Sequence, residues 1–443
     1  MPGGSSAPGS RRPGQKAGPV ILAIESLSHE GRGVARNDGK TVFVENALPG
    51  ETVSARIVRR HGRYDEAIAE CIERPSPDRT HPGCEHFGVC GGCSLQHMAP
   101  AAQIAHKQRM LLEQLQHVGR VAPSAVLPPV TGAAWGYRRR ARLGLRLVPK
   151  KGGVLVGFRE KNSRYIADIR RCPVLRPEVG ENLMVIRELI GALSCADQVP
   201  QIEVGVDDTG PVLTIRHIAP MTEEDLGRLG EAARRHDWRI YLQPGGIGSV
   251  HPLTTAQRPL CFAVPRHGVH LQFEPLDFIQ VNGDINLAAI DAVVALLEPR
   301  PDDRVLDLFC GLGNFTLPIA RRVAWTTGME GDAGLVARAQ ANAERNGIEN
   351  VEFLVADLTT AQPPPRPYNK VVLDPPRTGA IEILRRMDLR EASVVVYISC
   401  NPATLARDAA TLVHEHRFRL AKVGVMDMFP HTAHVESLAL FVR

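Results

Sequence analysis

The chain has 443 residues, 44% of them hydrophobic and 23% charged, which predicts a globular protein of two or three domains. It has no run of about 18 apolar residues and no apolar signal core near its start, so we expect a cytoplasmic protein without a membrane partner. Nine cysteines in a reducing compartment then indicate metal binding or catalysis rather than disulfides.

The first 75 residues fall into two parts. Residues 1–18 are rich in Gly, Ser and Pro and predict a disordered basic tail. Residues 19–75 contain short β-like runs such as TVFVENAL and ETVSARIVRR, separated by turn residues. Strands of this length and spacing predict a small OB-like β-barrel. A barrel that only packs on its neighbour is the alternative to one that binds a ligand.

The middle of the chain, residues 76–270, begins with a Cys/Pro/Gly loop and an amphipathic helix expected at 101–117. Apolar and polar residues then alternate, as in RARLGLRLV, which predicts a mainly antiparallel sheet. Residues 135–171 carry twelve Lys/Arg and two acids, a local excess of +10. Such a patch attracts polyanions such as RNA, although a charge run is more often a solvated face.

Residues 271–443 alternate helical and buried-strand patterns, including RVLDLF, VEFLVAD, KVVLD and ASVVVYIS. This βαβ order predicts a doubly wound, Rossmann-like parallel sheet. The last run, VESLALFVR, adds a final strand. The predicted fold class is therefore multidomain α/β, with the β-barrel and the antiparallel sheet preceding the doubly wound domain.

A glycine-containing turn follows the first strand of this domain, in RVLDLFCGLGNFTLPIA. The third glycine of the dinucleotide fingerprint is replaced by Thr316, which disfavours a nicotinamide cofactor. Glu330 ends the next strand, 23 residues after Asp307, where a carboxylate can hold ribose hydroxyls. Asp357 ends the third strand and suits an adenine amino group. An adenosine without a pyrophosphate loop indicates S-adenosylmethionine.

The fourth strand ends in LDPPRTGA, residues 373–380. Methyltransferases that act on exocyclic amines place an aromatic residue after such a Pro-Pro, to stack on the base. This chain has Arg377 there, so amine chemistry is disfavoured. Asp374 remains available to touch cofactor or substrate.

The fifth strand delivers Cys400 where strand gives way to helix. A cysteine buried for packing is the commoner case, but doubly wound folds bind ligands at this edge. Adding a thiolate to carbon 6 of uracil makes carbon 5 nucleophilic, so that it can take a methyl group from a sulfonium. A base must then remove the carbon-5 proton. We expect Cys400 to be the nucleophile.

The base is expected at Glu436, in DMFPHTAHVES, just before the last strand and near His431 and His434. The alternative is a surface position, which is usual for a glutamate near a chain end. A helix N-terminus after Pro402 would help to hold Cys400 as a thiolate.

Several segments, in this order, resemble the RNA uracil-C5 methyltransferase family, and they cover nearly all of the C-terminal half. They are FIQVN (278–282), DLFCGLGNFT (307–316), LDPPRTGA (373–380), ISCNPATLARD (398–408) and DMFPHTAHVES (427–437).

This resemblance implies that Cys400 is the nucleophile and Glu436 the proton acceptor. It also implies which residues line the S-adenosylmethionine site: Gln280, Phe309, Asn314, Glu330, Asp357 and Asp374.

Three upstream cysteines, Cys84, Cys90 and Cys93, form a C-x5-C-x2-C run, and Cys172 is a fourth candidate ligand. Their spacing fits either Zn²⁺ or an iron–sulfur cluster. In members of the resembled family that act on ribosomal RNA, this arrangement holds a [4Fe–4S] cluster. The resemblance therefore implies such a cluster, which we expect to shape the RNA site because methyl transfer needs no redox step.

The N-terminal barrel resembles the TRAM module, and the whole chain resembles the branch of the family that methylates bacterial 23S ribosomal RNA. The RNA partner is thus expected to be 23S rRNA, with the target base flipped out to reach Cys400. Aromatics among the basic residues, including Trp135 and Tyr137, could stack on bases or belong to the core. We expect a monomer, because no heptad pattern or extra apolar face stands out.

Three hypotheses remain from the sequence. The first is uridine-C5 methylation of 23S rRNA, or the same chemistry on tRNA. The second is methylation of another RNA position, such as an exocyclic amine, which would not need Cys400. The third is a non-enzymatic RNA-binding or iron–sulfur sensing protein, which would tolerate a change at Glu436.

Overall fold

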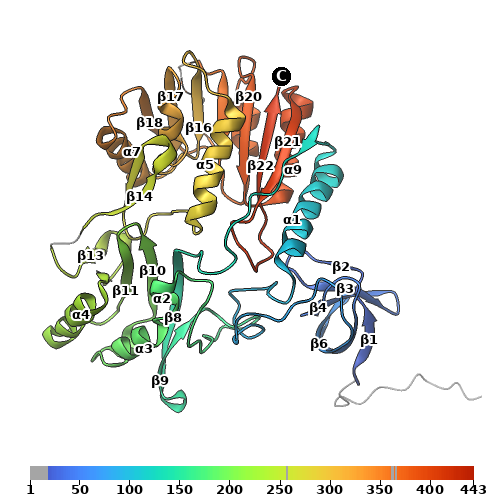
Figure 1. Ribbon diagram of the computed structural model, residues 1–443, viewed down its shortest axis with the longest axis vertical. Helices are drawn as coiled ribbons and strands as arrows, with labels where there is room; N and C mark the ends of the chain where they lie inside the picture. The colour runs from blue at the N-terminus through green and yellow to red at the C-terminus, as the bar shows by residue number, and fades with distance from the viewer. Residues whose placement is uncertain (1–17, 256–257, 361–363, 365–366) are drawn as a thin grey trace, which may run out of the picture. The chain divides into compact units, whose positions relative to one another are not determined.

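The computed structural model describes residues 18–255, 258–360, 364 and 367–443. The chain divides into two compact units, residues 1–81 and 82–443 (Figure 1). Apart from Gly18, the predicted basic tail lies outside the described residues. No helix within the described ranges is long and apolar enough to cross a bilayer.

The first unit contains one six-stranded sheet in the order β1-β5-β6-β4-β3-β2. Inward-facing side chains alternate along the strands and meet in one core that includes Leu22, Val42 and Val53. Register shifts between β5 and β6 bend the sheet, and the prediction of a small all-β N-terminal domain is confirmed. The strands are β1 (Val20–Ala23), β2 (Ser26–Leu27), β3 (Gly33–Asn37), β4 (Lys40–Glu45), β5 (Thr52–Arg60) and β6 (Tyr64–Arg74).

The second unit contains a central sheet in the order β13-β12-β11-β10-β8-β9. Every pair in it is antiparallel except β11 with β12, as the alternating pattern predicts. The strands are β8 (Arg140–Val148), β9 (Gly153–Gly157), β10 (Gln201–Asp207), β11 (Gly210–Arg216), β12 (Arg239–Gln243) and β13 (His251–Pro252); the helices are α2 (Pro177–Gly180), α3 (Leu183–Gly191) and α4 (Glu223–His236).

The C-terminal sheet of the same unit has the order β18-β17-β16-β19-β20-β22-β21-β7. The strands from β18 to β20 are parallel, and β22 is antiparallel to both β20 and β21. The doubly wound prediction is confirmed. The strands are β7 (Ala125–Val126), β16 (Arg304–Leu308), β17 (Trp325–Glu330), β18 (Val351–Val355), β19 (Lys370–Leu373), β20 (Val394–Ser399), β21 (Arg419–Met426) and β22 (Glu436–Val442).

Side-chain caps mark the starts of the helices that flank this sheet. Asn282, Asp332 and Asn401 each accept a hydrogen bond from a backbone N–H in the first turn of the helix they precede. The helices are α5 (Gly283–Leu297), α6 (Thr316–Ala320), α7 (Ala333–Arg345), α8 (Ile381–Arg386) and α9 (Pro402–Ala410).

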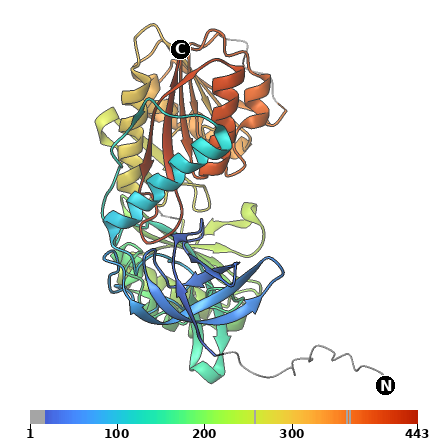
Figure 2. The same ribbon diagram turned by 90° about the vertical axis from the view of Figure 1, so that its right-hand side faces the viewer.

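Two early segments join the C-terminal sheet, although they lie within the predicted central domain. Strand β7 pairs with β21, and helix α1 (Pro100–Gln114) packs on β21 and α9 (Figures 1 and 2). The hairpin β14 (Leu260–Val264) and β15 (Val269–Phe273) shares a core with α5. Because residues 82–443 are one compact unit, the predicted division at residue 270 remains a prediction.

Candidate active site

The parallel strands of the C-terminal sheet end at one edge, as their registers show. Leu308 pairs with Met329 and with Leu373, and Leu373 pairs with Tyr397. The residues that directly follow or end these strands therefore meet there, including Glu330, Asp374 and Cys400. This is the edge at which doubly wound sheets bind ligands.

The turn after β16 brings backbone close to Glu330. Gly311 and Gly313 have φ values of 55° and 94°, and Phe309 has the left-handed value of 64°, a strained conformation for a residue with a side chain. The Gly311 N–H donates to Glu330 Oε2 at 3.1 Å, and the Gly331 N–H donates to Oε1 at 2.7 Å. The Glu330 carboxylate is thus fixed beside the turn, as a ribose ligand requires.

Two further residues predicted for the cofactor are anchored by neighbours. The side-chain amides of Asn314 and Asn286 exchange two hydrogen bonds of 3.0 Å each. The Gln280 carbonyl accepts from Arg139 Nε at 2.8 Å. The amide pair holds the Asn314 side chain, whereas the Arg139 contact holds the backbone at Gln280.

A cavity of about 530 Å³ opens at this edge, which is the usual size of a small-molecule site. The structure brings seven of the eight residues predicted for catalysis and cofactor binding into its wall: Gln280, Phe309, Asn314, Glu330, Asp374, Cys400 and Glu436. The residues predicted for catalysis and those predicted for the cofactor therefore share one cavity.

Asp357 does not line this cavity. It follows β18 on the exposed surface and accepts hydrogen bonds from Thr359 N at 2.9 Å and Thr359 Oγ1 at 2.7 Å. These bonds hold the pKa of Asp357 below its usual value. Its predicted role at the adenine remains a prediction.

Four phenylalanines that were not predicted for the site also line the wall: Phe262, Phe278, Phe315 and Phe429. Phe278 stands in the FIQVN motif and is 70% exposed, so the motif was a usable signal. Phe262 comes from β14, and nothing in its sequence context connects that hairpin to the site. Apolar rings at the rim can stack on a base or an adenine.

Cys400 and Glu436 face each other across neighbouring strands. Ser399 pairs with Ser437 in the antiparallel ladder of β20 and β22, so the next step along the ladder sets Cys400 opposite Glu436. Directly opposed residues of an antiparallel pair project to the same face. Both side chains line the cavity, and Glu436 is only 4% exposed.

Burial and nearby carboxylates disfavour the ionised forms of both groups. Burial, with smaller contributions from the neighbouring Glu436 and Asp374, raises the pKa of Cys400 to about 11, although Arg377 opposes them. Burial likewise raises the pKa of Glu436 to about 8, with a further contribution from Asp374. The site therefore holds a protonated thiol beside a carboxyl that titrates near neutral pH.

Arg377 supplies the positive charge nearest this pair. Its Nη2 lies 2.9 Å from His434 Nδ1, and its carbonyl accepts from Asn401 Nδ2 at 3.1 Å and from Thr404 Oγ1 at 3.3 Å. Burial and the neighbouring Arg377 lower the pKa of His434 to about 4. His434 is thus neutral and accepts a hydrogen bond from the Arg377 guanidinium. The positive charge of Arg377 favours the ionised forms of Cys400 and Glu436.

All four cysteines predicted as metal ligands line one separate cavity, together with Phe87 and Phe158. Burial, with smaller contributions from neighbouring cysteines, raises the pKa of Cys90 to about 11 and that of Cys93 to about 12. The nearby thiols Cys84 and Cys172 belong to no disulfide. Thiols crowded in an apolar wall stay protonated unless a cation compensates the charge.

The number of these cysteines suits either one metal ion or an iron–sulfur cluster. No group of three or more His, Cys, Asp or Glu side chains in the described part of the chain is arranged to hold one metal ion. Around one Zn²⁺, with Zn–S bonds of about 2.3 Å, thiolates must nearly touch. In a [4Fe–4S] cluster each thiolate binds a different iron and the sulfurs stand further apart.

The basic patch is more neutralised than its sequence window indicates. Glu203, on the adjacent strand β10, pairs with Arg140 and Arg142, and Glu181 pairs with Arg171. Among the aromatics, Tyr137 is buried, whereas Trp135 remains 38% exposed. The count of +10 therefore overstates the free positive charge, because acids distant in sequence lie beside the arginines.

Comparisons with known proteins agree with this geometry. Residues 262–443 match the family model described as tRNA (Uracil-5-)-methyltransferase, and residues 21–69 match the TRAM domain model. The chain is 52% identical to the 23S rRNA (uracil(1939)-C(5))-methyltransferase RlmD of Alkalilimnicola ehrlichii, over 98% of this chain and 99% of that one. It is 50% identical to the protein of the same name from Xanthomonas campestris pv. campestris strain 8004, over 96% and 97%.

Among solved structures, the chain resembles the tRNA (uracil-54, C5)-methyltransferase of Pyrococcus abyssi in complex with S-adenosyl-L-homocysteine. The TM-score is 0.75 at 23% identity, over 95% of this chain and 99% of that one. At this identity the likeness concerns the fold.

Proposed function

Since the chain belongs to the family of RNA uracil-C5 methyltransferases, we propose that it methylates carbon 5 of a uridine in 23S ribosomal RNA with S-adenosylmethionine as methyl donor. The observation that carries this proposal is the juxtaposition of Cys400 and Glu436 in the wall of a cavity that also contains Glu330 and Asn314. A thiol and a carboxyl side by side are what uracil-C5 chemistry needs, and amine methylation needs neither.

In the proposed reaction, the Cys400 thiolate adds to carbon 6 of the uracil, and the electron pair of the 5,6 double bond moves to carbon 5. Carbon 5 takes the methyl group that S-adenosylmethionine supplies when bound. Glu436 then accepts the proton from carbon 5. The released pair re-forms the double bond, and Cys400 leaves as a thiolate.

The side chains are suited to these roles by their surroundings. Cys400 needs to lose its proton before it attacks, and the charge of Arg377 favours that loss. Burial keeps the Glu436 carboxyl in a dry wall and raises its pKa to about 8, so its carboxylate is a stronger base than that of an ordinary glutamate. On the cofactor side, Glu330 would bind the ribose, and Gln280, Phe309, Asn314 and Asp374 would complete the S-adenosylmethionine site.

The substrate assignment predicts a selective transfer. With labelled S-adenosylmethionine, the enzyme should methylate a 23S rRNA fragment at least about 100-fold faster than tRNA, a gap of roughly 3 kcal/mol in transition-state binding. Nucleoside analysis should identify the product as 5-methyluridine. Faster labelling of tRNA would replace the substrate with tRNA, and a methyl group on an exocyclic amine would overturn the chemistry.

The four cysteines of the second cavity are proposed to hold a [4Fe–4S] cluster, as their number and their apolar wall support. Anaerobically purified protein should contain about four iron atoms per chain and show the visible absorption of an iron–sulfur centre. Cys93→Ser should reduce both, whereas Cys71→Ser, on the exposed surface of the N-terminal unit, should change neither. Stoichiometric zinc with no iron would contradict the assignment.

The N-terminal TRAM domain is proposed to bind the RNA. The protein is further proposed to act as a monomer in the cytoplasm. Bound RNA would have to present its uridine flipped out of any helix, because Cys400 and Glu436 lie in the wall of a cavity.

A further inference from the structure

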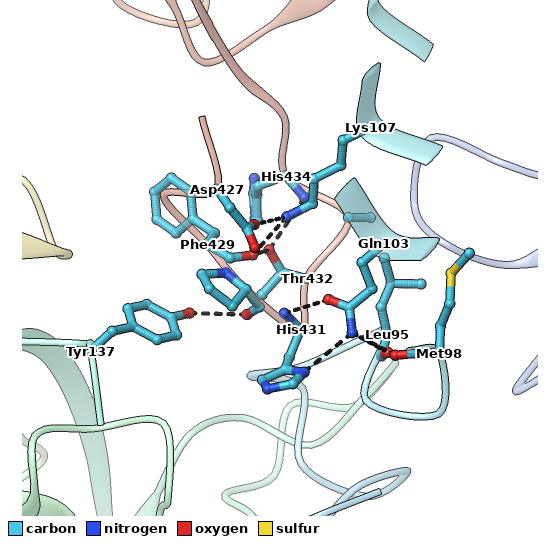
Figure 3. A network of polar contacts seen from close by, with 12 residues as sticks. Leu95, Met98, Gln103, Lys107, Tyr137, Asp427, Phe429, His431, Thr432 and His434 are labelled. Carbon is cyan, nitrogen blue, oxygen red and sulfur yellow. Dashed lines mark hydrogen bonds and ion pairs between the residues drawn. The ribbon is translucent and has the colours of Figure 1, made fainter. Parts of the chain in front are cut away.

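The segment that leads into Glu436 is a loop, residues 427–435, between β21 and β22. Within it, His431 has a left-handed φ of 65°, which a residue with a side chain adopts only when its surroundings impose it. The loop therefore depends on outside contacts for its shape. Figure 3 shows those contacts.

Lys107, on helix α1, makes the first of them. Its side chain is 1% exposed, and its Nζ donates to Asp427 Oδ1 at 2.7 Å and to the Phe429 carbonyl at 2.9 Å. A fully buried lysine is rare unless it is paired. The lysine thus binds the beginning of the loop at two points.

Gln103, one turn earlier on the same helix, makes the second. Its Oε1 accepts from the His431 N–H at 2.8 Å, and its Nε2 donates to the carbonyls of Leu95 at 3.0 Å and Met98 at 2.7 Å. One buried amide thereby joins the middle of the loop to the segment that follows the cysteine run (Figure 3).

That segment binds the loop directly as well. The N–H groups of Ser94 and Leu95 both donate to the His431 carbonyl at 2.9 Å, and the Ala433 N–H donates to Ser94 Oγ at 3.0 Å. Ser94 is the residue after Cys93, a lining residue of the cysteine cavity. From the other side, Tyr137 OH donates to the Pro430 carbonyl at 3.0 Å.

We propose that Gln103 and Lys107 are positioning residues for Glu436, and that Ser94 and Leu95 couple the cysteine site to the same loop. Binding of the cluster by the cysteines then also orders the loop that positions Glu436. This inference rests on the proposed function, because it assigns the loop to a single step of the reaction, the removal of the carbon-5 proton.

The two halves of the active site have different supports, which makes the inference testable. Cys400 is held by the end of β20 and the start of α9. Glu436 begins β22 directly after the loop of residues 427–435. Loosening the loop should leave thiolate addition and methyl transfer nearly intact while slowing proton removal, so that the methylated RNA stays covalently attached to Cys400.

The test is to compare Lys107→Met with Arg109→Met, which removes the same charge from an exposed position of the same helix. With ordinary 23S RNA, Lys107→Met should lower turnover about 10- to 100-fold, the usual effect of misplacing a catalytic group by about 1 Å. Single-turnover formation of the covalent protein–RNA adduct should change less than about 3-fold, and the adduct should accumulate on denaturing gels. Arg109→Met should match the wild type.

The outcomes of this comparison distinguish a failure of the inference from a failure of the proposed function. Equal losses of adduct formation and turnover would make Lys107 a merely structural residue and overturn the inference. Absence of any adduct with wild-type enzyme and 5-fluorouridine RNA would instead count against the proposed function. If Lys107→Met does not fold, Ser94→Ala removes only the hydrogen bond to Ala433 N and should give a smaller accumulation of adduct.

The coupling to the cysteine site has its own readout, hydrogen–deuterium exchange of peptides that cover residues 427–436. Exchange there should accelerate about 10-fold or more in both Lys107→Met and Cys93→Ser, because both release the loop. Cys71→Ser should leave it unchanged. Normal protection of the loop in Cys93→Ser protein that has lost its iron would rule the coupling out.

Discussion

Replacing Cys400 with alanine should abolish methylation, with a loss of at least about 10⁴-fold in kcat, since an alanine side chain has no nucleophile to offer. Wild-type enzyme offered 5-fluorouridine RNA and S-adenosylmethionine should stall as a covalent protein–RNA adduct, because fluorine at carbon 5 cannot leave as a proton. Cys400→Ala should form no adduct that survives denaturation. Binding of S-adenosylmethionine, measured by calorimetry, should remain, because the turn at Gly311 and the Glu330 carboxylate are untouched.

A matched control is Cys261→Ala, a partly exposed thiol of the β14 hairpin that does not line the cavity. It should form the adduct and turn over at the wild-type rate. An adduct that persists in Cys400→Ala, or 5-methyluridine made by that variant, would assign the nucleophile elsewhere and revive a mechanism without covalent catalysis.

The strand-end residues of the site could be predicted because a parallel sheet converts chain order into proximity. In a parallel sheet every strand ends at the same edge. Glu330, Asp374 and Cys400 therefore had to meet once their strands were recognised. Gln280 followed from the resemblance, and Glu436 from its place just before the last strand together with the resemblance. The role of Asp357 stays a prediction, since its carboxylate accepts from Thr359 in its own loop and does not line the cavity.

The contacts of Gln103 and Lys107 with the loop before Glu436 could not be predicted, because they bury polar residues of helix α1 that a helical pattern assigns to solvent. Helix α1 was expected to bury an apolar stripe, yet its buried residues include Gln103, His106 and Lys107. Polar residues on a helix normally indicate its solvent face. Their partners lie more than 300 positions later, at Asp427 and His431, and a single sequence carries no signal for such pairings.

The free charge of the central basic patch, residues 135–171, could not be predicted either, for a related physical reason. A window of sequence counts charges along the chain, whereas a sheet sets residues from distant strands side by side. Glu203 faces Arg142 because β10 pairs with β8, with Glu203 opposite Arg142 in the ladder. A charge count becomes a surface potential only after the strand order is known.

Replacing Glu436 with glutamine should stop the enzyme after methyl transfer. The amide cannot accept the carbon-5 proton, so turnover should fall about 10²- to 10⁴-fold, the range for loss of a general base. The methylated RNA should remain attached to Cys400, and mass spectrometry of the trapped complex should show RNA plus one methyl group. A variant with full turnover would identify another base, and one that forms no adduct would place Glu436 in an earlier step.

The pH dependence follows from the carboxyl's surroundings, and its sign can be worked out. Proton removal requires the ionised carboxylate, and burial together with Asp374 raises the pKa of Glu436 to about 8. Below that pH the protonated form dominates, so the rate of product release in wild-type enzyme should rise about 10-fold per pH unit and level off above it. The residual release in Glu436→Gln should lack this rise.

Because the Cys400 thiol titrates higher, with a pKa of about 11, adduct formation and product release should show different pH profiles. Single-turnover rates measured from pH 6 to 9 separate the two steps, and a common profile for both would mean that one ionisation governs the whole reaction.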